Sequence, residues 1–384
     1  MRWPRIPVER LRFFTPRFCP WPECPEHTRR SPGYRFRHHG GYATRRRSCV
    51  PRFRCSICHR TFSRQSFAVS YYLKRPELVV PVAAGLQAGS AHRQIARTLG
   101  CAPSTVTRLS ARLGRHAILL TAHALQHLEG QLAEPVVLDH FETFEFTQDF
   151  PFGVATPVGR DSWFVYGLDP APHRRTGTRS AAQQARLARR PRRALHGGYR
   201  SSSSRVLEQL LRLAPASRPL DLAGDGHPAY DRAVERFAGR VDLRRFPNLR
   251  RGPKGTPRTP EMVARDQAMF PADSLHALLR HTLAHHRRET IAFGRRVNAL
   301  MERLFLATVW RNFVKWRSER KPDPVSPAMR VGLTAERWKW RRVFARRLFP
   351  GREKLPPVWR EIYRRDWTTP VLRSNTCHRL VHAY

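Results

Sequence analysis

The chain has 384 residues and carries 71 Lys and Arg against 29 Asp and Glu, so its formal charge at pH 7 is +42. This charge far exceeds what solubility requires, and the basic residues are spread along the whole chain, which indicates a polyanionic partner. No apolar run approaches the roughly 20 residues of a membrane-spanning helix, and the N-terminus lacks the apolar core of a signal peptide. Seven cysteines, an odd number, do not suit a disulfide framework and favour a reducing cytoplasm.

Four cysteines near the N-terminus form two close pairs. Cys19 and Cys24 are separated by four residues, and Cys55 and Cys58, after a further 30 residues, by two. Each pair can form a knuckle that gives two thiolates to a tetrahedral Zn²⁺, with a hairpin between them, so we predict a zinc ribbon over residues 1–70. A set of free buried thiols is the alternative. The segment also holds substitute ligands (His27, His59 and Cys49) and aromatic residues for a small core (Phe53, Phe62 and Phe67).

A second module, placed at residues 71–130, resembles a helix-turn-helix. Ile95 and Leu99 fall four apart on one helix, Gly100 permits a turn, and Pro103 suits the first turn of the next helix. An ordinary helical hairpin is the alternative, but the arginines around it favour DNA. The expected DNA-contacting residues on the open side of the second helix are Ser104, Thr105, Thr107 and Arg108, and the other arginines are Arg93, Arg97, Arg112 and Arg115.

From about residue 134 the pattern changes to strands and helices. Three antiparallel strands, then helix, strand, helix and strand, is the order expected of an RNase H-like core, so the predicted fold class is α/β with a mixed sheet. A segment over 173–204, rich in Arg, Ala and Ser, predicts an insertion or a flexible DNA-contacting arm. The expected strands are 135–144, 152–158, 162–168, 220–223 and 241–246, the expected helices are 206–213 and 230–237, and 247–260 is expected to be loop.

Three carboxylates occupy positions where such a core could hold metal ions. Asp139 lies in the first strand, and Asp225 lies in the turn after a later strand. Glu289 heads a stretch with a helical pattern that runs to about Trp316. Acids at strand tips and on a helix can converge on one or two Mg²⁺ ions, because Mg²⁺ prefers hard oxygen ligands.

Each of these acids has a neighbour that competes for its role. Glu142, three residues after the first acid, should point to the opposite face of the strand, and Asp221 would share a face with the second acid but sits at the strand start. Glu302 lies thirteen positions after Glu289, on roughly the opposite helix side, so Glu289 is preferred. Ordinary salt-bridged acids are the alternative for all three. Four histidines are expected to be neighbours of the site: His276, His281, His285 and His286.

Zinc ribbon, helix-turn-helix and RNase H-like core in this order resemble a bacterial insertion-sequence transposase of the DDE class. The resemblance implies that Asp139, Asp225 and Glu289 are catalytic and hold two Mg²⁺ or Mn²⁺ ions during strand cleavage and strand transfer. It also implies an arginine about two turns after the glutamate, so Arg295 and Arg296 would hold phosphates. The 86 positions between the two aspartates exceed the gap in compact members, which the insertion explains.

The resemblance further implies a catalytic core over residues 131–316 and a basic, Trp-rich C-terminal region over 317–384. The tryptophans of that region either stack on bases or pack C-terminal helices onto the core. The implied partners are double-stranded DNA, as transposon ends and target, and further copies of the chain on that DNA; the implied location is the bacterial cytoplasm, at the nucleoid. Two alternative functions are a DNA-binding regulator with an inactive core and a metal-dependent nuclease that cuts without joining.

Overall fold

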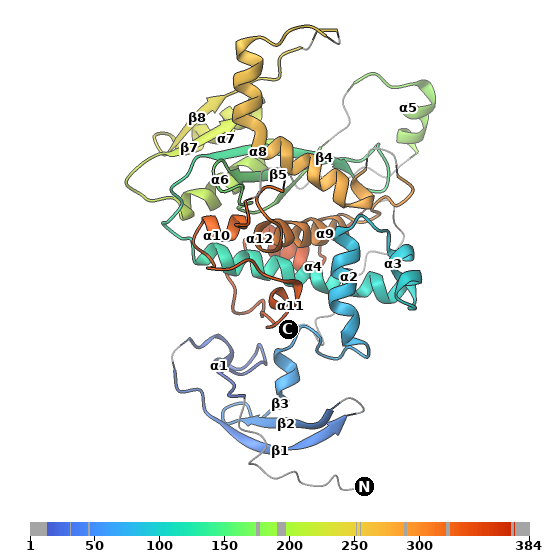
Figure 1. Ribbon diagram of the computed structural model, residues 1–384, viewed down its shortest axis with the longest axis vertical. Coiled ribbons are helices and arrows are strands. Elements are labelled where there is room, and N and C mark those ends of the chain that lie inside the picture. The colour runs from blue at the N-terminus through green and yellow to red at the C-terminus, as the bar shows by residue number, and fades with distance from the viewer. Residues whose placement is uncertain are drawn as a thin grey trace.

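The computed structural model describes residues 14–30, 32–44, 47–173, 177–189, 197–250, 252–253, 255–287, 290–319, 323–369 and 372. It is a mixed α/β structure with a three-stranded sheet near the N-terminus and a mixed five-stranded sheet (Figure 1). Within the described part of the chain, every helix is too short or too polar to cross a membrane. The predicted α/β class and mixed sheet are therefore confirmed, whereas the domain boundaries at residues 70, 130 and 316 stay predictions.

The N-terminal sheet is a hairpin with one short added strand. Strands β1 (Phe36–Thr44) and β2 (Arg47–Cys55) pair antiparallel, and β3 (Thr61–Ser63) pairs antiparallel with β2. The short helix α1 (Pro25–Thr28) precedes the hairpin, and the 3₁₀ turn η2 (Arg64–Phe67) follows it. A small core forms around the buried Phe53 and Phe62 with Phe67 against them, as expected from the sequence.

Helical structure follows the N-terminal sheet. After a 3₁₀ turn η3 (Pro76–Leu78) come α2 (Val79–Gln87), α3 (His92–Thr98) and α4 (Pro103–Gln126). Gly100 has a φ of +55°, a left-handed conformation that glycine adopts without strain, and this lets the chain turn sharply between α3 and α4. The first turns of α4 lie beside α3, whereas its later residues are almost all buried and pack against α9 (Val297–Val309). One helix thus joins the predicted helix-turn-helix to the core.

The five-stranded sheet has the order β6-β5-β4-β7-β8. Strands β4 (Val136–Phe144), β5 (Pro151–Gly159) and β6 (Asp169–Pro172) are antiparallel neighbours. Strands β7 (Leu220–Gly224) and β8 (Val241–Arg245) run parallel to β4. The half of the sheet that comes first in the chain is therefore antiparallel, and the other half is parallel.

Helices cover both faces of this sheet. Side chains alternate between the faces along a strand, and Val137 of β4 packs against Met269 and Ala272 of α8 (Pro260–Thr282). On the other face, His140 of β4 contacts Tyr199, at the start of α6 (Tyr199–Leu213), and Tyr230 of α7 (Pro228–Val234). Odd-numbered residues of β4 consequently face α8. The remaining short elements are α5 (Ala181–Ala188), η4 (Glu235–Phe237) and η5 (Ala284–His286).

Residues 323–369 pack against the core. Helix α9 continues as a π-helical turn, η6 (Trp310–Val314), and is followed by α10 (Pro327–Arg330), α11 (Trp340–Val343) and α12 (Pro357–Arg364). Trp359 is 1 % exposed, and its Nε1 donates to the carbonyl of Leu168 at 2.8 Å. Trp367 is 3 % exposed. Of the two expectations for the C-terminal tryptophans, packing holds for these two side chains.

Two sequence expectations in the core are wrong. Residues 162–168 do not form the third strand, which is β6, because the side chain of Asn312 bonds both the N–H and the carbonyl of Val165. The serines 201–204 do not belong to a flexible arm; they lie in α6, and Ser202 donates to the carbonyl of Asp169 at 3.1 Å. Small serine side chains allow the helix to lie close to the sheet, so residues 199–204 are not part of the predicted insertion.

Candidate functional site

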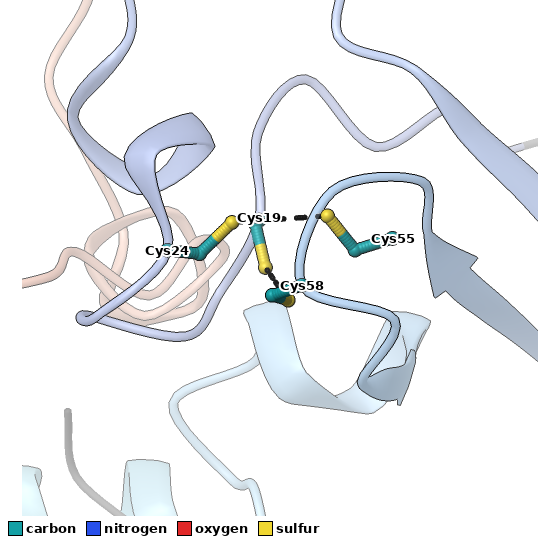
Figure 2. A group of neighbouring side chains, drawn as sticks. All are labelled: Cys19, Cys24, Cys55 and Cys58. Carbon is teal, nitrogen blue, oxygen red and sulfur yellow. Dashed lines mark hydrogen bonds between the residues drawn. The ribbon is translucent and has the colours of Figure 1, made fainter.

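Four cysteine sulfurs lie together beside the N-terminal sheet (Figure 2). The Sγ atoms of Cys19 and Cys58 are 3.7 Å apart, and those of Cys24 and Cys55 are 3.8 Å apart. All four atoms lie within 4.8 Å of one another. Sulfurs bound tetrahedrally to Zn²⁺ at about 2.3 Å are separated by about 3.8 Å. The cluster could therefore hold a metal such as zinc.

Local backbone geometry produces this cluster. Cys24 lies immediately before α1, and Cys55 ends β2, so a helix start and a strand end bring the two pairs together. The N–H of Ile57 points at Cys55 Sγ at 3.4 Å. Burial raises the pKa of Cys19 strongly and that of Cys24 to about 11. Burial acts the same way on Cys55, but nearby backbone N–H groups outweigh it and lower the pKa to about 7.

The three substitute ligands considered from the sequence are not in the cluster. His27 is buried, and its Nδ1 lies 2.8 Å from the carbonyl oxygen of Cys19. Cys49 lies on β2, near Gly41 of β1, and His59 has a φ of +57° in the turn after the second pair. The four cysteines predicted from the sequence form a group that could hold a metal.

A second site lies at the ends of two strands of the larger sheet. In the parallel pair of β4 and β7, Leu138 is opposite Gly224, and Asp139 and Asp225 are the next residue on each strand. Adjacent strands are about 4.8 Å apart, and residues in matched register share a face. The two carboxylates predicted from the sequence are therefore neighbours on the face that α8 covers.

This site concentrates negative charge. Burial, followed by the charge of Asp225, raises the pKa of Asp139 to about 7, and Asp273 of α8 adds to the effect. Asp139 Oδ1 accepts the N–H of His140 at 2.7 Å, and Asp225 Oδ1 accepts that of His227 at 3.0 Å. The backbone bonds fix both carboxylates, and the remaining repulsion favours a bound cation.

Helix α8 supplies polar side chains that the sequence analysis missed or placed only as neighbours. Asp273 and His276 are three positions apart, so they lie on the same face of the helix. His276 Nδ1 is 3.6 Å from Asp139 Oδ2. Burial lowers the pKa of His276 to about 3, so the ring is neutral at physiological pH. Arg265, about two turns earlier on α8, binds Asp273 at 2.5 Å. In the sequence, the three-residue spacing of Asp273 and His276 was the signal that could have identified them as a pair on one helix face.

The third predicted acid, Glu289, lies outside the described residues. The expectation that it heads a helix leading to Arg296 is wrong, because residues 290–296 are not helical and α9 begins at Val297. The carbonyl of Gly294 instead accepts the N–H of Phe146 at 2.9 Å, which ties this segment to the loop after β4. Of the two expected phosphate-binding arginines, Arg295 is exposed and Arg296 is the N-cap of α9.

The competing acids have structural partners. Glu302 is 1 % exposed, and its carboxylate binds Arg365 at 2.6 Å and Arg115 at 3.4 Å. Glu142 lies 3.1 Å from the ring of His173 on the opposite face from Asp139, as expected. The last competitor, Asp221, binds Arg244 at 2.6 Å near the start of β7. These contacts account for all three side chains.

The expected DNA-contacting residues lie on the first turns of α4. Ser104, Thr107 and Arg108 are exposed, and Thr105 is half-buried. Thr107 Oγ1 lies 3.0 Å from His92 Nδ1 of α3, so it also joins the two helices. Two of the surrounding arginines face inward instead. Arg112 donates to the carbonyls of Val69 and Tyr71, and Arg115 is in the ion pair with Glu302.

No protein-family model matches the chain, and no curated protein is significantly similar to it in sequence. Among the described residues, the four cysteines are the one group in which three or more ligand atoms lie within 4.8 Å of one another. The acidic site brings together Asp139 and Asp225, with Asp273 and His276 on the helix above them.

Proposed function

We propose that the chain is a DNA transposase of the DDE class, which binds insertion-sequence ends and catalyses Mg²⁺-dependent strand cleavage and strand transfer. The observation that carries the proposal is the pairing of Asp139 and Asp225 in matched register on adjacent parallel strands. Two half-buried carboxylates that repel each other, and for which the described residues provide no arginine ion pair, suit divalent cations with hard oxygen ligands.

The topology of the larger sheet supports an RNase H-like core. Three antiparallel strands followed by two parallel ones, in the order β6-β5-β4-β7-β8, agree with the arrangement expected from the sequence. In that arrangement the first acid lies on the central strand and the second follows the strand beside it. Asp139 on β4 and Asp225 after β7 fit this description.

Features outside the core support a DNA partner. The formal charge of +42 favours phosphate contacts. Ser104 and Arg108 are exposed on the first turns of a helix that follows a tight turn, which is how a recognition helix presents side chains to the major groove. The four-cysteine cluster beside a three-stranded sheet fits a zinc ribbon whose metal is structural.

In the proposed reaction Asp139 and Asp225, together with Glu289, would hold the cations. Bound there, two Mg²⁺ ions would stabilise charge on the attacking and leaving oxygens of an in-line displacement at phosphorus. The chain's own contribution is orientation: backbone N–H groups of His140 and His227 fix one oxygen of each aspartate. The exposed Arg295 would bind a neighbouring phosphate.

The test is Mg²⁺-dependent cleavage and joining of DNA that carries the terminal repeats flanking the gene. Asp139→Asn, Asp225→Asn and Glu289→Gln should each lose joined product by at least about 1,000-fold, because each removes a cation ligand. Asp221→Asn is the matched control, since this aspartate lies on β7, just before the second acid, but pairs with Arg244. Cleavage without joining would indicate the nuclease instead, and tight DNA binding without chemistry would indicate the regulator.

A further inference from the structure

His276 of α8 faces Asp139 across a short gap. Its Nδ1 lies 3.6 Å from Asp139 Oδ2, and its Nε2 lies 2.8 Å from the hydroxyl oxygen of Thr156 on β5. The side chains of His276 and Asp139 are 15 % and 17 % exposed, so both are partly open to solvent. Asp139 Oδ1 already accepts the N–H of His140, which leaves Oδ2 as the oxygen that faces the ring.

In the neutral form that a metal-binding histidine takes, the hydrogen bonds of Thr156 determine which ring nitrogen carries the hydrogen. Thr156 Oγ1 donates to the main-chain carbonyl of Asp139 at 2.9 Å, and this uses its single hydrogen because a carbonyl oxygen can only accept. The same oxygen can therefore only accept from His276, so Nε2 carries the ring hydrogen. Nδ1 then directs a lone pair at the carboxylate of Asp139.

A histidine that binds a metal is neutral, and its unprotonated nitrogen can share one cation with a carboxylate oxygen that it faces. A shared proton does not close this gap, because 3.6 Å exceeds the length of an N–H···O or O–H···N hydrogen bond. Two ligands of one divalent cation, each bound at about 2.1 Å, lie about 3 to 4 Å apart. The separation of Nδ1 and Oδ2 suits two ligands of a single ion.

We propose that His276 Nδ1 is a metal ligand that shares a divalent cation with Asp139 in the acidic site. The inference rests on the proposed function for the presence of a cation at Asp139, and it adds a nitrogen ligand from α8. Metal-binding histidines usually donate their second ring N–H to a fixed partner, and Thr156 is that partner here. A nitrogen ligand strengthens binding of first-row transition metals relative to Mg²⁺, so the site should prefer Mn²⁺.

The experiment uses the full-length, zinc-loaded chain and Mn²⁺, with electron spin-echo envelope modulation to detect nitrogen bound directly to manganese. We expect a nitrogen coupling that changes when the protein contains ¹⁵N-histidine and that is absent from His276→Gln. Mn²⁺ affinity should fall about 10-fold or more in this variant, because removing a residue that only orients a metal ligand already lowers metal affinity by about that factor. His281→Gln is the control, since His281 is exposed on the same helix, and it should bind Mn²⁺ normally.

Thr156→Val keeps the ring but removes the acceptor that holds it, so it should weaken both the coupling and the affinity without abolishing them. The ¹⁵N comparison needs only the wild-type chain and therefore does not depend on a variant that folds. Mn²⁺ binding that requires Asp139 but has no histidine nitrogen coupling would overturn the inference and leave the proposed function standing. Mn²⁺ binding that Asp139→Asn leaves unchanged would contradict both.

Discussion

The cysteine cluster and the acidic site are assembled over very different distances along the chain. The four cysteines lie between positions 19 and 58, on either side of one hairpin, whereas the acidic site takes Asp139, Asp225 and His276 from β4, β7 and α8. Three of the cysteines are also buried members of the small N-terminal core. The cysteine site is therefore part of the folding of its own segment, while the acidic site depends on a sheet that other residues already stabilise.

The largest expected effect is loss of the N-terminal fold when a cysteine ligand is removed. Structural zinc sites contribute about 10 to 16 kcal/mol to folding of small metal-binding segments. Cys55→Ser should therefore lose the bound zinc and expose the hairpin of β1 and β2 to protease, as measured by metal content and limited proteolysis. Cys49→Ser is the control because this thiol is outside the cluster. Normal zinc content and protease resistance in Cys55→Ser would show that the N-terminal fold does not depend on the cysteine site.

A buried acid with no metal role should give the next largest effect. Glu302→Ala leaves Arg115 and Arg365 without their carboxylate, and breaking such a buried pair costs about 3 to 5 kcal/mol. We expect a lower urea midpoint with Mn²⁺ affinity unchanged. Glu129→Ala, which removes an exposed ion pair with Lys354, should change stability by less than about 0.5 kcal/mol. A loss of Mn²⁺ affinity in Glu302→Ala would mean that this residue belongs to the acidic site.

The carboxylates of the acidic site should lower the stability of the folded chain when no cation is bound, because they repel each other. The cysteines, in contrast, belong to a hydrophobic core. The pKa of Asp139 in the folded chain is about 7, above its ordinary 3.8, so the folded state binds the proton more tightly between these values. The free energy of unfolding then falls as pH rises from about 4 to 7 and levels off above 7, by at most about 4 kcal/mol. Asp139→Asn should consequently raise the Tm at pH 8 more than at pH 5.

Thermal unfolding of the wild-type protein and of Asp139→Asn, without added divalent cations and from pH 5 to 8, measures this difference in Tm. Added Mn²⁺ should stabilise the wild-type chain at pH 8 and reduce the advantage of the variant. Asp221→Asn should not raise the Tm, because it removes the ion pair with Arg244. A variant that is no more stable than wild type at pH 8 would mean that solvent already neutralises the repulsion.

The same contrast between local and distant assembly explains which structural features the sequence predicted. Three features depend mainly on residues nearby in the sequence, and they were predicted correctly. They are the grouping of the four cysteines, the turn at Gly100, and the strands that carry Asp139 and precede Asp225. The break between α8 and α9 was missed, because a bond from Phe146 to the carbonyl of Gly294 helps to set it. Local periodicity carries no information about a partner so far along the chain.

The orientation of α8 was missed for a related reason. His276 was expected only as a neighbour of the site and Asp273 was missed, because their contacts depend on how α8 lies over β4 and β5. The segment 162–168 has the alternation of a strand, but Asn312 takes both hydrogen bonds of Val165. For this segment, a side chain distant in sequence satisfies the backbone groups that a strand would pair.

The smallest expected effect concerns α4, whose first turns are again a locally encoded feature. Arg108 is exposed there, whereas Arg112, one turn later, donates to main-chain carbonyls. If Arg108 contacts a base, Arg108→Ala should cost about 1 to 3 kcal/mol on the preferred DNA end and relax the sequence preference. If it contacts a phosphate, affinity should fall equally on all sequences, and the slope of log affinity against log salt should decrease by about 1.

Anisotropy titrations at several salt concentrations, with the exposed Arg212→Ala as control, separate the two contacts. Equal losses in both variants would mean that α4 contributes only general positive charge, and the helix-turn-helix would then be an ordinary part of the core.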